Sequence, residues 1–86
     1  MNNGMLAYVA EVGNMIDYLS GVNAANVRRD RMIDALNTIR AYCLEQVVDA
    51  TAIHDINIAY DDLRDAIVSA AELEVEEYAN KYTADH

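Results

Sequence analysis

Apolar residues recur at steps of three and four along most of the chain, which is the pattern of helices with one apolar face. In the first such segment, about residues 3–20, the apolar positions are Met5, Tyr8, Val9, Val12, Ile16 and Leu19. In the second, about residues 24–48, they are Val27, Met32, Leu36, Ile39, Cys43 and Val47. In the third, about residues 55–82, they are Ile56, Tyr60, Leu63, Ile67 and Ala70. The pattern predicts three helices and an all-α fold.

Two short turns are predicted between these helices. Residues 20–23 contain Gly21, which can end a helix, and Asn23, which can begin the next one. Residues 49–55 contain several possible N-caps and little periodicity, so the second turn is placed there. The chain has three glycines and no proline, so few other breaks are expected. We therefore expect one domain, residues 1–86, folded as an antiparallel three-helix bundle.

The predicted helices differ in length, which suggests that one copy of the chain is not the complete structure. The first helix is shorter than the other two by about seven residues, so a simple bundle leaves part of them uncovered. An apolar shoulder beside the core face of the third helix consists of Val68, Val75 and Tyr82. A chain of 86 residues also buries a smaller share of its surface than a longer one. We expect homodimerisation through this shoulder to complete the bundle.

The amino-acid composition limits the kind of core and the cellular compartment that we expect for the protein. Hydrophobic residues make up 53% of the chain, but Phe and Trp are absent, so the core is expected to be aliphatic with tyrosines at its edge. The single cysteine, Cys43, has no partner for an internal disulfide and is expected to be a small buried residue in a reducing compartment. No apolar run approaches the roughly 20 residues of a membrane span. These features predict a cytoplasmic protein that does not enter the membrane.

The net charge of −9 is distributed unevenly. Residues 1–47 hold five acidic residues and four arginines, whereas residues 48–86 hold ten acidic residues against Arg64 and Lys81. A strongly negative field repels nucleic acid and anionic lipid and attracts basic protein surfaces. We therefore do not expect the chain to bind DNA or RNA directly. We expect a basic protein partner instead.

Four of these acidic residues form one stripe on the third predicted helix. With Asp61 at zero on a helical wheel, Asp65 lies at about 40°, Glu72 at about 20° and Glu76 at about 60°. The stripe is about 22 Å long, and its i,i+4 pairs of like charge each cost a few tenths of a kcal/mol. It is either a solvated face that keeps a small domain soluble or a binding surface for a basic, nucleic-acid-binding cleft.

A cluster of cations, Arg28, Arg29 and Arg31, lies in the first turns of the second predicted helix, where the helix dipole disfavours positive charge. Pairing with Asp30, Asp34 or the acidic third helix would explain the cluster. The alternative is an anionic ligand such as a nucleotide phosphate.

The sequence contains no signature of catalysis or of a cofactor. It has no glycine-rich phosphate loop, no Cys or His pair at metal-ligand spacing and no Ser-His-Asp arrangement. His54 is the only histidine before the last residue, and a lone imidazole is usually polar surface. We therefore expect a protein that is not an enzyme and that binds neither a metal nor a cofactor.

In its size, helical character and acidity, the chain resembles the small proteins by which phages and mobile elements block host defences, several of which mimic nucleic acids. This resemblance implies a protein-binding inhibitor, of the anti-defence or anti-CRISPR type, that occupies the nucleic-acid-binding surface of a host protein. Residues 58–66 also resemble the last helix of phage proteins that sequester cyclic-nucleotide signals. That likeness implies a nucleotide sponge in which the arginine cluster holds phosphates. A structural oligomerisation module is a third alternative.

Overall fold

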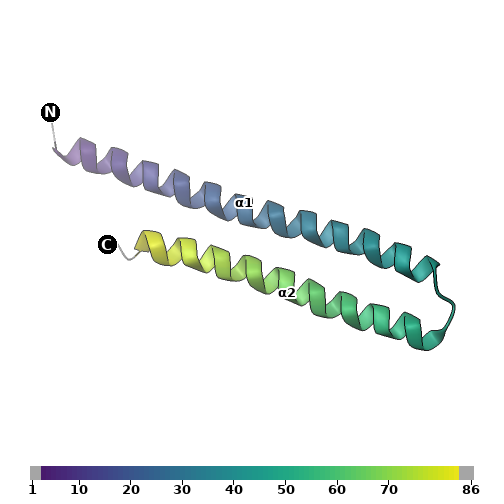
Figure 1. Ribbon diagram of the computed structural model, residues 1–86. Helices are drawn as coiled ribbons and strands as arrows, with labels where there is room; N and C mark the ends of the chain where they lie inside the picture. Colours follow the sequence, from purple (N-terminus) through teal and green to yellow (C-terminus); the bar gives the residue numbers. More distant parts are fainter. Residues whose placement is uncertain (1–2, 84–86) are drawn as a thin grey trace.

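The protein is a hairpin of two long antiparallel helices in the computed structural model, which describes residues 3–83 of the backbone and residues 4–81 with their side chains. Helix α1 spans Asn3–Glu45 and helix α2 spans Ala50–Thr83 (Figure 1). The prediction of an all-α fold is confirmed. The prediction of a three-helix bundle is wrong, because the first two predicted helices form one continuous helix.

The first predicted turn, at residues 20–23, is absent. Gly21 makes room for a side chain of α2 instead of ending a helix. Gly21 lies in the middle of α1 and faces Tyr78 of α2, and its backbone conformation is not one that requires glycine. A Cβ atom at position 21 would lie 2.5 Å from Cε1 of Tyr78, which is too close for any side chain. The glycine therefore allows an aromatic ring to approach the backbone of a helix rather than ending that helix.

The second predicted turn exists, but it lies at residues 46–49 instead of 49–55. The amide of Gln46 donates to the carbonyl of Cys43 (3.1 Å), which closes the last turn of α1. Asp49 caps α2, since its carboxylate accepts from the amide of Ala52 (3.3 Å) and its carbonyl accepts from the amide of Ile53 (3.0 Å). This cap begins α2 five residues earlier than the sequence pattern predicts.

The hairpin is long and only one layer of helices thick. Its principal extents are 73 × 19 × 7 Å and its radius of gyration is 20.3 Å. A compact domain of this length has a radius of gyration of about 12 Å. Two helices lying side by side in one layer cannot enclose a core from all directions.

The buried contact between the helices is correspondingly narrow. The buried apolar residues in the described part of the chain are Ala25, Leu36 and Ala71. Two of the three are alanines, whose small side chains let the helices approach closely. Tyr60 adds a polar contact near the loop, because its hydroxyl donates to Oδ1 of Asn37 and its ring lies 3.9 Å below the guanidinium of Arg40.

The core predicted from the sequence is only partly correct. Leu36 is buried, and Cys43, Val47, Ile56, Tyr60 and Ile67 are half-buried. The predicted core residues that are exposed instead are Met5, Tyr8, Val9, Val12, Ile16, Leu19, Val27, Met32, Ile39, Leu63 and Ala70. The physical reason is that each helix has one neighbour rather than two, so that a narrow strip of each apolar face is covered.

The first part of α1 extends past the end of α2, and no other helix of the described residues lies beside it. Gly21 lies opposite Tyr78, and α2 ends at Thr83, five residues further on. Helix α2 therefore ends near the level of residue 16, and α1 continues alone beyond it (Figure 1). We call residues 3–15 the projecting segment.

Candidate functional site

The four carboxylates of the predicted stripe are all solvent-exposed on α2. Asp61, Asp65, Glu72 and Glu76 follow one another along the side of the helix, as the sequence predicts. Within the described part of the chain, Arg28 pairs with Glu74 and Arg29 with Asp30, and none of the four stripe carboxylates takes part in an ion pair. The charges of the stripe are therefore available to an external cation.

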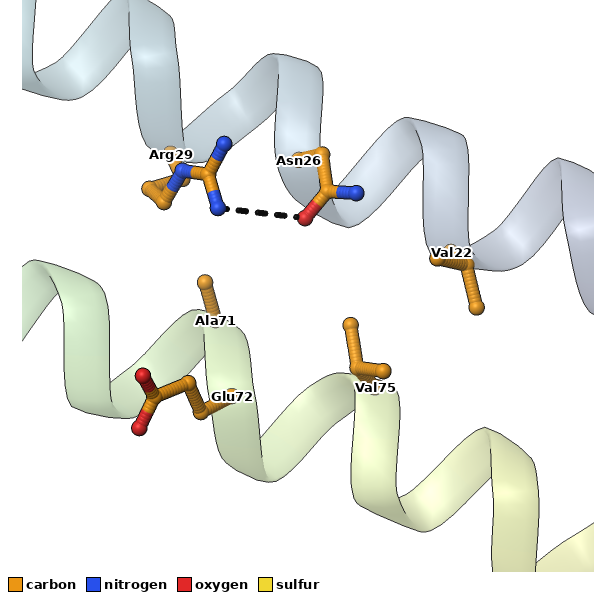
Figure 2. A pocket seen from close by; sticks show the side chains of 6 residues that line it. All are labelled: Val22, Asn26, Arg29, Ala71, Glu72 and Val75. Atoms are coloured by element: carbon orange, nitrogen blue, oxygen red, sulfur yellow. Dashed lines mark hydrogen bonds between the residues drawn. The ribbon is translucent and has the colours of Figure 1, made fainter.

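An open groove between the helices shows which residues of α1 lie on the same side of the hairpin as this stripe. The groove is lined by Val22, Asn26, Arg29, Ala71, Glu72 and Val75 (Figure 2). Nη1 of Arg29 donates to Oδ1 of Asn26 (3.4 Å), while the Glu72 carboxylate lies across the groove from this guanidinium without pairing with it. Asn26 and Glu72 therefore lie on the same side of the hairpin.

Helical spacing extends that side along α1. Asp30 and Asp34 follow Asn26 by one and two turns, so they lie on the same side as Glu72. Both are exposed. We call this surface the acidic side, defined by Asp30, Asp34, Asp61, Asp65, Glu72 and Glu76.

The opposite side of the hairpin is marked by an ion pair. Nη1 of Arg28 lies 2.7 Å from Oε2 and 2.8 Å from Oε1 of Glu74. The hydrogen bond and the negative charge of Glu74 raise the pKa of the Arg28 guanidinium above its ordinary value. On the wheel of α2, Glu74 lies about 180° from Asp65 and about 20° from Leu63, so the ion pair is far from the acidic side.

Two rows of apolar side chains extend from this ion pair toward the connection between the helices. On α1, Arg28 begins a row at steps of four and three that continues with Met32, Ala35, Ile39 and Tyr42, all of which are exposed. On α2, the side that bears Glu74 also bears an exposed row at the same spacing: Ala59, Leu63, Ala66, Ala70 and Leu73. We call these two rows together the apolar side.

The arginine cluster does not form one site. Arg28 points to Glu74 at the apolar side, whereas Arg29 lines the groove and pairs with Asp30 (3.0 Å). Arg31 is exposed. The three guanidinium groups therefore do not converge, and two of them have carboxylate partners of the kind that the sequence suggested.

The apolar shoulder of Val68, Val75 and Tyr82, through which the sequence predicts homodimerisation, is partly covered within one chain. Val68 and Val75 are half-buried, and Val75 points toward Val22 of α1 across the groove (Figure 2). Tyr82 belongs to α2, but its side chain lies outside the described residues. These valines contribute to packing within one chain, and their participation in a dimer stays a prediction.

The remaining reactive side chains are dispersed. Cys43 is a half-buried free thiol, and His54 is exposed. No three residues of the His, Cys, Asp and Glu types come close enough to hold a metal ion in the part of the chain that the structure describes. Among the described residues, neither helix has a stretch long and apolar enough to cross a membrane.

Comparisons with known proteins give no relative. No protein-family model matches the chain, and comparisons with curated proteins and with solved structures find no match either.

The apolar side is the surface that the sequence analysis did not identify. Leu63 and Ala70 were predicted to be core, and Met32 and Ile39 were assigned to the inward face of another helix. The signal was the spacing in α2, since Ala59, Leu63, Ala66, Ala70 and Leu73 repeat every 3.5 residues on average, as in a helix that packs along its length on a neighbour. A second set of apolar residues, Tyr60, Ile67 and Ala71, faces α1.

Proposed function

We propose that this chain is a non-enzymatic binding protein that docks its acidic side on a basic surface of a partner protein. The observation that carries the proposal is the row of four exposed carboxylates on α2, which has no cation partner within the described residues. Like charges at this spacing repel one another, and a basic partner would relieve that repulsion. Asp34, which is exposed and has no ion pair among the described residues, widens the negative surface onto α1, whereas the charge of Asp30 is balanced by Arg29.

A nucleic-acid-binding protein is the partner class that fits this surface best. The row is about 22 Å long, and a nucleic-acid duplex presents several backbone phosphates over that distance. A rigid helix that carries charges over this length would compete with the nucleic acid for a basic cleft. The proposed role is therefore inhibition of such a protein, including the anti-defence role that the resemblance to phage inhibitors implies.

The test compares two variants of equal net charge. The first neutralises the row with Asp61→Asn, Asp65→Asn, Glu72→Gln and Glu76→Gln. The control neutralises four exposed carboxylates elsewhere, namely Glu11, Asp17, Asp62 and Glu77. Each protein is used to capture partners from a bacterial lysate at low salt, and the captured proteins are identified by mass spectrometry.

We expect a basic protein to bind the wild type and the control, to be lost from the first variant, and to be displaced by duplex DNA. High salt should weaken the same interaction, because surface charges are screened. Equal loss from both variants would show that net charge alone is responsible, and binding that survives in the first variant would contradict the proposal.

The nucleotide sponge requires a different arrangement of the arginines. Phosphate binding would need guanidinium groups to converge, and Arg28 would have to leave Glu74. Calorimetric titration with cyclic and linear nucleotides tests this alternative, for which we expect no heat of binding. The third alternative, a structural oligomerisation module, would use the apolar side of the hairpin rather than the acidic side.

A further inference from the structure

We propose that a second copy of this chain covers the apolar side, so that two hairpins pack face to face as a four-helix assembly. The surface consists of Met32, Ala35, Ile39 and Tyr42 on α1 and of Ala59, Leu63, Ala66, Ala70 and Leu73 on α2. This inference is independent of the proposed function, because it uses the side of the hairpin that lacks the carboxylate row.

The first argument is that the hairpin lacks a second layer. Stable domains bury the apolar faces of one layer of helices against another layer. This chain supplies one layer, 7 Å in its thinnest extent, and buries only Ala25, Leu36 and Ala71 among its described apolar residues. A second hairpin is the simplest source of the missing layer, since it presents a surface of the same length and width.

The second argument is the amount of exposed surface. The hairpin exposes 6597 Å², whereas a compact monomer of its mass exposes about 5,100 Å². The excess is about 1,500 Å² per chain, so two copies that removed it would bury about 3,000 Å² in total. Obligate homodimers bury about 2,000–5,000 Å², so the excess matches the area that a stable dimer needs.

The third argument is the geometry of the two rows. Side chains that repeat every 3.5 residues keep facing a neighbouring helix over several turns. In the α2 row two alanines, Ala66 and Ala70, lie between Leu63 and Leu73, which lets a partner helix approach closely between the large side chains. The Arg28–Glu74 ion pair joins α1 and α2 at one end of these rows and shows that both rows lie on the same side of the hairpin, where both would contact the same partner.

The acidic side remains accessible in this assembly. It lies on the opposite side of each hairpin, so a face-to-face dimer presents two acidic sides, one on each outer surface. Their separation also keeps the two carboxylate rows apart, which limits the repulsion between chains that each carry a net charge of −9.

The experiment is sedimentation equilibrium of the full chain from low micromolar to submillimolar concentration, with two matched variants. Leu63→Ala removes a large side chain from the apolar side and keeps a strong helix former. Ile58→Ala removes one of similar size, and with similar exposure, from the carboxylate side of α2, where Ile58 lies about 20° from Asp65 on the wheel.

For the wild type we expect twice the chain mass of 9.6 kDa. Leu63→Ala should weaken the dimer about tenfold or more, and Ile58→Ala less than about twofold. A helical wild type with the mass of one chain over the whole range would overturn the inference. Equal weakening by the two variants would also overturn it, because the contact would then not be specific to the apolar side.

Discussion

Both parts of α1 contain large apolar residues at helical spacing, but the two parts have different surroundings. In the projecting segment, Met5, Leu6 and Val9 are all more than half exposed. In the segment paired with α2, Ala25 is 1% exposed and Leu36 is 9% exposed. The difference shows that an apolar face contributes to stability only where another helix covers it. The local sequence pattern is the same whether or not that helix is present.

The sharpest way to test this comparison is to truncate one leucine in each part. Leu36→Ala should lower the free energy of unfolding by about 2–4 kcal/mol, because it leaves a cavity between the helices. Leu6→Ala, in the projecting segment, should change it by less than about 0.5 kcal/mol. Urea unfolding followed by circular dichroism at one fixed protein concentration measures both. Equal losses would show that the projecting segment is covered in solution.

The two glycines of α1 give the second test, in which the effects should have opposite signs. A Cβ atom at Gly13 would meet nothing within 4 Å, so Gly13→Ala should stabilise the helix by about 0.5–1 kcal/mol. Gly21→Ala gains the same helix propensity but collides with the Tyr78 ring, and should destabilise the protein by about 1–3 kcal/mol. Thermal unfolding of both variants at one concentration measures the contrast.

A double variant separates the collision from other effects of changing Gly21. In a Tyr78→Ala background the ring is absent, so Gly21→Ala should become neutral or stabilising. A penalty that persists without the ring would mean that Gly21 is needed for another reason.

The smallest expected effect concerns the Arg28–Glu74 ion pair, which joins the paired segment to α2. The Arg28 side chain is 57% exposed and that of Glu74 is 30% exposed, so a double-mutant cycle with Arg28→Gln and Glu74→Gln should give only a weak coupling. Salt should reduce it. Because the pKa of Arg28 is raised, its charge is retained throughout the neutral range, and this coupling would be lost through Arg28 only in strong alkali. A coupling that salt does not change would indicate a pair shielded from solvent.

The helical structure, and the grouping of apolar residues into rows along each helix, could be predicted from the sequence because both depend on local spacing. The carboxylate row could be predicted for the same reason, since Asp61, Asp65, Glu72 and Glu76 share one side of any continuous helix. The capping role of Asp49 could also be predicted, because aspartate is a preferred N-cap and the second predicted turn begins at this residue.

The number of helices could not be predicted, because it depended on a contact between residues far apart in the chain. Gly21 and Asn23 are typical of a turn, and only the ring of Tyr78 shows why a glycine occupies the middle of a helix. The predicted core face of α2 was only partly correct, for a related reason: Ile56, Tyr60 and Ile67 are half-buried, but Leu63 and Ala70 are exposed. Helix α2 carries two apolar rows, and the sequence does not say which of them faces α1.

The four-residue connection at 46–49 sets the order in which the hairpin is expected to form. Next to it, the contacting residues of α1 and α2 are few positions apart, and closing such a short loop costs little chain entropy. At the other end, Gly21 meets Tyr78 only after the whole length between them has been brought together. Pairing should therefore start at the connection and advance toward the termini. Amide hydrogens should exchange most slowly near the connection and fastest in the first turns of α1, so that the hairpin opens from its free ends.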